Sequence, residues 1–348
     1  MEFTSTLFFL LPFLLLYTVI VVYAERKLSA FIQDRLGPME VGYYGILQTV
    51  ADLLKLLQKE RIVPTTASPW LFAIAPVVIF LAVFLGMAVL PLNSTWSGAN
   101  LYSGLFFVLA ITSLDVVGIL MAGWASGNKY STLGAIRSVA QIISYEVPLG
   151  LSVMAVALFS GSLNLQEISI AQSGQSTIYF LGIKAFDVTG LGGFLAWNVF
   201  QMPVLFIVWI VFFICSLAES NRAPFDLPEA ESELVAGFQT EYSGFPWAII
   251  MLAEYGMMLL TSLLGAILFF GSWNSILPGV AGNYTSGPVW GIFWLVFKTL
   301  IFVAIQIWVR WTFPRLRINQ LISLSWKFLT PVMLVSLFII ALWKLLLV

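Results

Sequence analysis

Long apolar runs, each about as long as a membrane-crossing helix, alternate along the chain with short polar stretches. A spanning helix needs about 20 mainly apolar residues. The runs that meet this length lie at 6–24, 69–91, 103–125, 139–160, 200–218, 245–270, 288–309 and 328–348. Backbone polar groups in lipid must be satisfied within each segment, so the runs predict α-helices. We expect an all-α integral membrane protein with about eight transmembrane helices, forming one membrane domain over residues 1–348.

Composition agrees with this pattern and narrows the chemistry. The chain is 60% hydrophobic and only 9% charged, whereas a soluble domain carries roughly 25% charged residues. It has no His and a single Cys, Cys215. Haem, iron–sulfur clusters and zinc are usually held by His and Cys. We therefore expect no haem, iron–sulfur cluster or metal in this chain, so any electron chemistry must come from partner proteins. A net charge of −1 gives no sign of nucleic-acid binding.

Basic residues are distributed unequally between the loops on the two sides of the predicted spans. Loops on one side contain Arg26, Lys27, Arg35, Lys55, Lys59, Arg61, Lys129, Arg137, Arg222, Arg310, Arg315, Arg317 and Lys327. Loops on the other side contain only Lys184. The positive-inside rule makes the first side cytoplasmic. With an even number of spans, both termini are expected outside, and the loops 25–68 and 219–244 are expected in the cytoplasm.

The first cytoplasmic loop contains a segment with helical periodicity. Apolar residues recur at helical spacing over 46–57, with polar residues such as Gln48, Asp52 and Lys55 between them. This segment is too polar to span and fits an amphipathic helix lying in the membrane interface. It is either a simple surface anchor or one wall of a crevice that opens at membrane level.

The second cytoplasmic loop is unusually acidic. Its carboxylates are Glu219, Asp226, Glu229, Glu231, Glu233 and Glu241. Asp226 and Glu229 have the spacing of a capping box, which indicates a helix start. The loop is then either a solvated acidic helix or part of a proton-accepting path. Carboxylates that share a poorly hydrated site raise one another's pKa, which such a path requires.

Ionisable residues also lie within the predicted spans, namely Asp115, Glu146, Glu254 and Lys298. A charge at the centre of the bilayer costs at least ~2.5–3.5 kcal/mol, so such residues indicate function by default. Alternatively, some of them could pair with one another and have no further role, for example Lys298 with a carboxylate. None of these four is His or Cys, so they point to proton handling more than to a metal site.

Several long motifs carry a family resemblance. They are AERK at 24–27, QDRLGP at 33–38, LQTVADLLKL at 47–56, GWASGNKYS at 123–131, QIISYEVPLGLS at 141–152, NRAPFDLPEAESELVAGF at 221–238, EYSG at 241–244, LAEY at 252–255 and VRWTFPRLRINQLISLSWK at 309–327. Over nearly the whole chain the sequence closely resembles the H subunit of proton-pumping NADH:quinone oxidoreductase, respiratory complex I. The mitochondrial relative of that subunit is the first NADH dehydrogenase subunit.

The resemblance implies a helical subunit of the bacterial cytoplasmic (inner) membrane, at the joint between the membrane arm and the hydrophilic arm. In that family the subunit forms much of the tunnel through which quinone, a substrate, enters from the bilayer. The implied partners are peripheral iron–sulfur and quinone-site subunits on the cytoplasmic side. Small and antiporter-like membrane subunits, together with lipid, would surround it laterally. The family's acidic residues begin the path that couples quinone reduction to proton pumping.

The motifs assign roles to particular positions. For the quinone tunnel they are Gln33, Arg35, Gln48, Asp52, Lys55, Arg222, Phe225 and Asp226. For the proton path they are Glu146, Glu219, Glu229, Glu231, Glu233, Glu241 and Glu254, with Lys298 as a modulating charge. Two positions depart from the family pattern. Asn319 stands where an Asp is usual and cannot take up a proton, and Asp115 lies where many relatives are expected to have an apolar residue.

Three alternatives compete with this interpretation. Related subunits occur in membrane-bound nickel–iron hydrogenase complexes, which bind no quinone. A stand-alone ion transporter would also place carboxylates at mid-membrane, but it should show repeats or broken spans. A purely structural anchor would explain the interfacial helix and leave the intramembrane acids without a reason.

Overall fold

The protein is described here by a computed structural model, covering residues 2–94, 98–175, 192–227, 235–277 and 287–347. These residues form helices joined by turns, and no strand occurs among them. The long helices are α1 (Glu2–Ile32), α3 (Pro69–Val89), α6 (Lys129–Ser160), α9 (Pro203–Glu219), α11 (Phe245–Phe269), α13 (Pro288–Thr312) and α15 (Thr330–Leu347). The shorter helices are η1 (Tyr43–Gly45), α2 (Gln48–Gln58), α4 (Gly104–Thr112), α5 (Leu114–Ala125), α7 (Leu165–Ile170), η2 (Ala171–Gln175), η4 (Gly193–Ala196), α8 (Asn198–Gln201), η5 (Gly237–Gln239), α14 (Ile318–Leu324) and η6 (Ser325–Leu329).

Within the described residues, seven helical segments are long and apolar enough to cross a membrane. They correspond to seven of the eight predicted spans, and the eighth, predicted at 200–218, is the apolar helix α9. α9 has 17 residues, a little short of the usual spanning length of about 20. The expected all-α integral membrane fold is confirmed.

Three span boundaries differ from the prediction by eight residues or more, because a helix does not end where its apolar run ends. The first span was expected to end at residue 24, but α1 continues to Ile32 through the charged AERK motif. The fourth span was expected to begin at 139, but α6 begins at Lys129. The Asn128 side chain caps α6 by accepting a hydrogen bond from the backbone N–H of Tyr130, as a good N-cap residue does. The last span was expected to begin at 328, but its helical segment begins at Ile318.

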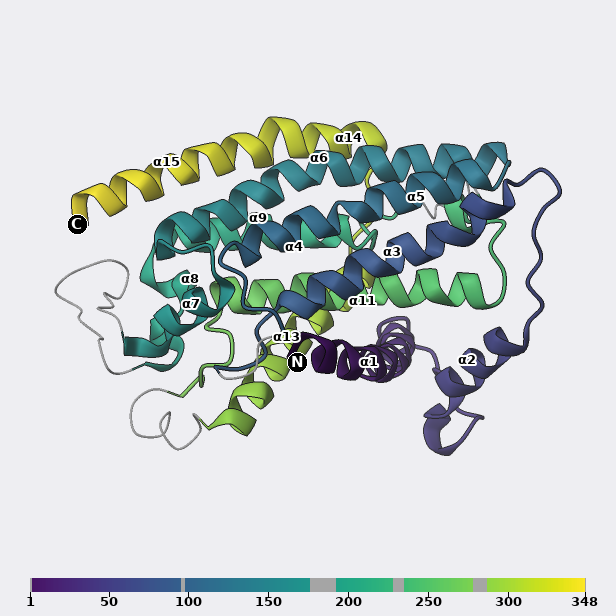
Figure 1. The fold of residues 1–348 in the computed structure, drawn as a ribbon, viewed down its shortest axis with the longest axis horizontal. Coiled ribbons are helices and arrows are strands. Elements are labelled where there is room, and N and C mark those ends of the chain that lie inside the picture. The colour runs from purple at the N-terminus through teal and green to yellow at the C-terminus, as the bar shows by residue number, and fades with distance from the viewer. Residues whose placement is uncertain (1, 95–97, 176–191, 228–234, 278–286, 348) are drawn as a thin grey trace.

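Helix α11 lies at the centre of the bundle. It packs against α3, α9 and α13 and is buried over most of its length, including Gly256 to Phe269 without interruption. α6 packs against α5, α9 and α15. Figure 1 shows most of the long helices running side by side, with α2 at one end of the bundle and α7 and α8 at the other. α11 therefore forms the buried centre against which the outer helices pack.

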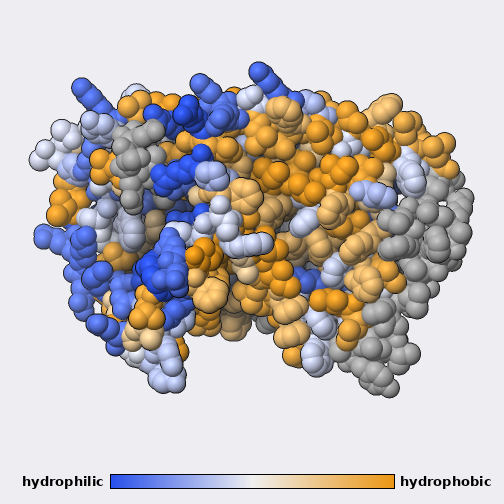
Figure 2. Space-filling model, turned by 180° about the vertical axis from the view of Figure 1, so that it is seen from behind, coloured by the Kyte–Doolittle hydropathy of each residue, from blue (hydrophilic) through white to orange (hydrophobic). Residues whose placement is uncertain are grey.

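The predicted amphipathic helix at 46–57 is confirmed as α2. It stands beside α1 and α11 at one end of the bundle and leaves apolar side chains such as Val50, Leu54 and Leu57 exposed. Hydrophilic residues gather at this end in Figure 2, and hydrophobic ones cover much of the remainder of that face. This separation suits a bundle set in a membrane with one polar end in water. Which side that end faces stays a prediction from the charge bias.

Candidate functional site

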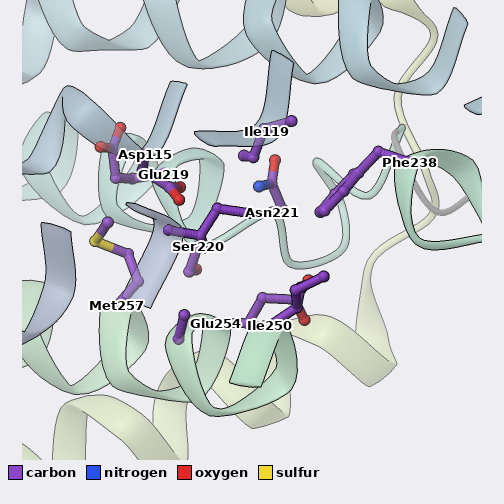
Figure 3. Close-up of a pocket in the computed structure, with 11 residues that line it drawn as sticks. Asp115, Ile119, Glu219, Ser220, Asn221, Phe238, Ile250, Glu254 and Met257 are labelled. Atoms are coloured by element: carbon purple, nitrogen blue, oxygen red, sulfur yellow. The ribbon is translucent and has the colours of Figure 1, made fainter. Parts of the chain in front are cut away.

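A small pocket in the bundle is lined by carboxylates from three separate segments (Figure 3). Asp115 comes from α5, Glu219 from the end of α9 and Glu254 from α11. The apolar lining includes Ile79 and Met257. The space open to the centre of a water molecule is about 10 Å³, on the order of one water. The pocket therefore has room for water between carboxylates and is too small for a larger ligand.

Two of the pocket's carboxylates, Asp115 and Glu219, are buried, and each has a carboxylate oxygen without a hydrogen-bond donor among the described residues. Asp115 is 6% exposed and Glu219 is 3% exposed. Glu146, from α6, interacts electrostatically with both. Asp115 Oδ1, Glu146 Oε1 and Glu219 Oε2 are buried and accept no hydrogen bond from any described residue. Like charges in a poorly hydrated site cannot all be ionised together. The cluster is therefore suited to holding and exchanging protons.

Glu254 connects this pocket to a second buried group. Its Oε1 accepts a hydrogen bond from Gln239 Nε2 at 2.5 Å, and it interacts electrostatically with Arg222. Gln239 belongs to η5, which packs against α6. Glu254 thus links the acidic pocket, which it lines, to the guanidinium of Arg222, with which it interacts.

Arg222 takes part in a buried ion cluster around Glu25 that the sequence did not reveal. Arg222 Nη1 lies 3.2 Å from Glu25 Oε1, and Arg310 Nη1 bonds to the same oxygen. Tyr255 donates its hydroxyl to Glu25 Oε2 at 2.7 Å, and its ring lies 4.2 Å from the Arg222 guanidinium. Burial lowers the pKa of Arg222, but Tyr255, Glu25 and Glu254 outweigh it and raise the pKa above its usual range. Arg222 therefore stays charged.

The first-loop residues predicted to line a quinone tunnel form exposed polar contacts around α2. Arg26 Nη1 bonds to Asp52 Oδ2 at 2.5 Å, and Lys55 Nζ lies 3.7 Å from the other oxygen. Gln48 Nε2 donates to Asp52 at 3.2 Å. Nearby in sequence, Arg35 Nε donates to Gln33 at 2.7 Å. The structure thus brings Gln48, Asp52 and Lys55 together on α2.

Asp52 should make the attachment of α2 sensitive to acid. Burial raises the pKa of its carboxyl, but the hydrogen bond and charge of Arg26, helped by Gln48 and Lys55, outweigh burial and lower the pKa. A depressed folded pKa adds stability above the unfolded pKa of about 4, and this stability is lost as the pH falls through the folded value. We expect the α2 amides to exchange faster at acid pH, by an amount limited to about 1 kcal/mol for a partly exposed pair.

Hydrogen exchange of the assembled protein, corrected for the intrinsic rates, measures this effect. The Asp52→Asn variant should lose the additional acid sensitivity in α2. An acid response of the same size in that variant would assign the effect to another group.

Phe225 and Asp226 are held by contacts within the chain. Phe225 is buried and packs edge-to-face on Tyr145, with ring centroids 5.2 Å apart. Asp226 Oδ2 pairs with Arg315 Nη2 at 2.9 Å. Both follow Arg222 in the same turn, so this turn connects the ion cluster around Glu25 to Arg315.

Lys298 does not pair with a carboxylate among the described residues, contrary to one of the alternatives considered from the sequence. Its buried ammonium donates to the carbonyls of Ser272 (2.9 Å) and Asn274 (2.7 Å) and lies 4.9 Å from the centre of the Trp197 ring. Glu241 accepts a hydrogen bond from Asn128 Nδ2 at 2.7 Å. Three other predicted proton-path residues, Glu229, Glu231 and Glu233, lie outside the described residues.

The contacts of Glu25, Tyr255 and Arg310 were not predicted from the sequence. All three lie within the quoted motifs, but the first span was expected to end before Glu25, which placed its carboxylate in a loop. Among the described residues, no group of three or more His, Cys, Asp or Glu side chains is arranged to hold a metal ion.

Comparison with known proteins places the chain in a family. The family model described as NADH dehydrogenase matches residues 4–341. The second H subunit of NADH-quinone oxidoreductase from Cytophaga hutchinsonii is 53% identical, over 96% of this chain and 97% of its own length. The H subunit from Chlorobium luteolum is 52% identical, over 96% and 87%. The H subunit from Geobacillus sp. (strain WCH70) is 45% identical, over 97% and 93%.

These relatives are bacterial and match nearly full length, and the chain has the apolar helices of a multi-pass protein of the inner membrane. The resemblance noted from the motifs is thereby confirmed. The chain belongs to the family of the NADH-quinone oxidoreductase H subunit, which is a membrane component of respiratory complex I.

Proposed function

We propose that this chain guides quinone from the bilayer toward its reduction site and begins the path that couples quinone reduction to proton pumping. The relatives are named as subunits of an NADH-quinone oxidoreductase, which favours this function over a role in a hydrogenase complex. The observation that carries the proposal is the buried pocket where Glu219 and Glu254 meet, one step from Arg222.

The quinone side of the proposal rests on the end of the bundle around α2. Exposed Leu54 and Leu57 offer an apolar surface, and Asp52, Lys55 and Arg26 supply charge beside it. Ligand sites for amphipathic molecules combine an apolar lining with a few placed polar groups. We assign the remaining tunnel positions, Gln33, Arg35, Gln48, Arg222, Phe225 and Asp226, to the same route.

Reduction of the quinone itself would take place on partner subunits. Peripheral iron–sulfur and quinone-site subunits would supply the electrons on the cytoplasmic side. Small and antiporter-like membrane subunits would receive the coupling laterally. Quinone is the substrate in this scheme, and this chain contributes the route and the proton-holding groups.

The proton side rests on the ion cluster and the acidic pocket. Quinone reduction takes electrons from partner subunits and protons from groups beside the quinone, so the groups that give up protons change the charge near Arg222. Arg222 interacts with Glu25 and Glu254, so a change in its surroundings alters the proton affinity of Glu254. A nearby charge within ~4–6 Å moves a carboxyl pKa by whole units. Glu254 can then exchange a proton with Glu219 through the pocket, and Glu219 interacts with Glu146.

The remaining predicted positions are proposed as extensions of this path. Glu229, Glu231 and Glu233 belong to the acidic segment between Asp226 and η5. Glu241 follows η5 and contacts Asn128. Lys298 lies among backbone carbonyls, and we assign it a modulating charge rather than a place in the sequence of proton transfers.

Replacing Glu219 or Glu146 by Gln tests the proposal. Gln keeps the shape of Glu but cannot carry a proton, so quinone reductase turnover and proton pumping should both fall. We expect a loss on the order of tenfold or more, since a positioned proton-transfer group contributes about 10²-fold or more to a rate. The assay uses the assembled complex in proteoliposomes with NADH and a quinone.

The matched control is Glu167→Gln. Glu167 is exposed on α7 and contacts Ser162, so this variant should retain both activities. Normal turnover and pumping in Glu219→Gln and Glu146→Gln would refute the proposed path.

A further inference from the structure

Asp115 is a buried acid to which the family resemblance assigns no role. We propose that Asp115 and Glu219 hold one proton between them across the water-sized pocket, and that Asp115 is an additional proton-carrying residue of this chain. The second part rests on the proposed function, whereas the shared proton stands on the geometry alone.

The two carboxyl groups come from different helices and line one pocket. Figure 3 shows Asp115, in the first turn of α5, beside Glu219, at the end of α9. Both line the same pocket and interact electrostatically. Each is more than nine-tenths buried. The two acids are therefore held at one place by the packing of α5 and α9 within the bundle.

Each carboxyl also has an oxygen with no partner. Asp115 Oδ1 and Glu219 Oε2 are buried and accept no hydrogen bond from the described residues. A purely structural acid in such a place would be expected to be paired, because an unsatisfied buried polar atom costs about 1–3 kcal/mol, and more when charged. The unpaired oxygens and the space for one water molecule together indicate that these oxygens bind a proton and a water molecule.

The pocket lining supplies no positive charge to balance this pair. Glu146 on α6 interacts with both acids, and Glu254 on α11 lines the pocket. Packed against them are Ile79 of α3 and Ile119 of α5. None of the residues that line the pocket is basic. Two adjacent carboxylates without a cation cannot both ionise, so one proton is retained and shared, as in other paired acids.

The shared proton has a simple use. When it moves from the Glu219 carboxyl to the Asp115 carboxylate, the negative charge moves the opposite way, and nothing is oxidised or reduced. A water molecule in the pocket would connect the pair to Glu254, which lines the same space. The negative charge within the site therefore moves from Asp115 on α5 to Glu219 at the end of α9, and no proton enters from outside.

Infrared difference spectroscopy of the assembled complex, comparing its oxidised and reduced states, tests the shared proton. The carbonyl stretch of a protonated carboxyl reports each such group. We expect Asp115→Asn and Glu219→Gln each to perturb the same band, and the double variant to remove that band without removing a second one. Glu167→Gln should leave it unchanged. If Asp115→Asn does not assemble, Asp115→Leu introduces an apolar residue, the type expected in many relatives, and gives the same readout.

Two spectroscopic results would overturn the shared proton: an unchanged spectrum for the Asp115 variant, or perturbation of two separate bands by the two single variants. Proton pumping per quinone reduced, measured on the same variants, tests the place of Asp115 in the path. A loss in both Glu219→Gln and Asp115→Asn supports it. A loss in Glu219→Gln alone removes Asp115 from the path and leaves the proposed function standing. No loss in either refutes the proposed function, while the carboxyl band still decides the shared proton.

Discussion

Replacing Glu25 by Gln is expected to destabilise the chain by about 3–5 kcal/mol, the usual cost of removing one partner from a buried ion pair. Glu25 is 5% exposed and holds Arg222, Arg310 and Tyr255 at once. Gln keeps the shape but not the charge, so it leaves the buried Arg222 guanidinium without its main counter-ion. The thermal midpoint of the purified complex, followed at this subunit, should fall, and less of the chain should be assembled.

Two comparison variants define the cause. Asp52→Asn removes an ion pair that is partly exposed, and it should cost no more than about 1 kcal/mol. Removing both charges in Glu25→Gln with Arg222→Met should recover part of the loss, because the buried Arg222 charge is then gone and only the more exposed Arg310 has lost its partner. A thermal midpoint unchanged by Glu25→Gln would show that the cluster does not hold the bundle together.

Gly134→Ala is expected to be the most damaging small substitution in α6. A Cβ at this position would lie 2.7 Å from Cα of Gly237 and 2.9 Å from its carbonyl carbon, closer than packed atoms can approach. α6 and η5 would have to separate, and η5 carries Gln239, the partner of Glu254. Overpacking of this kind typically costs about 1–3 kcal/mol, and displacement of Gln239 should lower quinone reductase turnover as well.

The same helix supplies the control. Gly150 is also in α6, and a Cβ there would meet nothing within 4 Å. Gly150→Ala should be neutral or stabilising by up to about 1 kcal/mol, since Ala is the better helix former. The thermal midpoint should therefore fall in the first variant and hold or rise in the second, and only the first should lose turnover. Equal behaviour of the two would mean that the α6–η5 contact is not tight in the assembled complex.

The fold could be predicted largely from the sequence, because apolar runs of spanning length leave few alternatives to helices in lipid. The limits of the helices could not. Apolar character reports contact with lipid or protein, whereas a helix ends where backbone hydrogen bonding ends. α1 passes through AERK to Ile32, because neither Gly nor Pro interrupts that stretch before Gly37 and Pro38.

The candidate site could be predicted in its members but not in its pairings. Glu146, Glu219 and Glu254 were recognised as buried or clustered acids, yet spacing along the chain does not say which helices pack together. Glu219 and Asp115 line one pocket because α9 and α5 both pack against α6, a contact between segments far apart in the sequence. Glu25 was overlooked for the same reason, since its partners Arg222 and Arg310 lie 197 and 285 residues away.

The turn between α9 and the acidic segment has a consequence for how its length can vary. In succession it contributes Glu219, Ser220 and Asn221 to the pocket, Arg222 to the cluster around Glu25, and Asp226 to Arg315. Asn221 has a positive φ of 49°, and its side chain accepts a hydrogen bond from Gln141. Each of these residues thus contacts a specific neighbour elsewhere in the chain. Insertion or deletion of a single residue here would move every later residue of the turn away from its partner. Loop-length variation among homologues should therefore be absent from this turn and concentrated elsewhere.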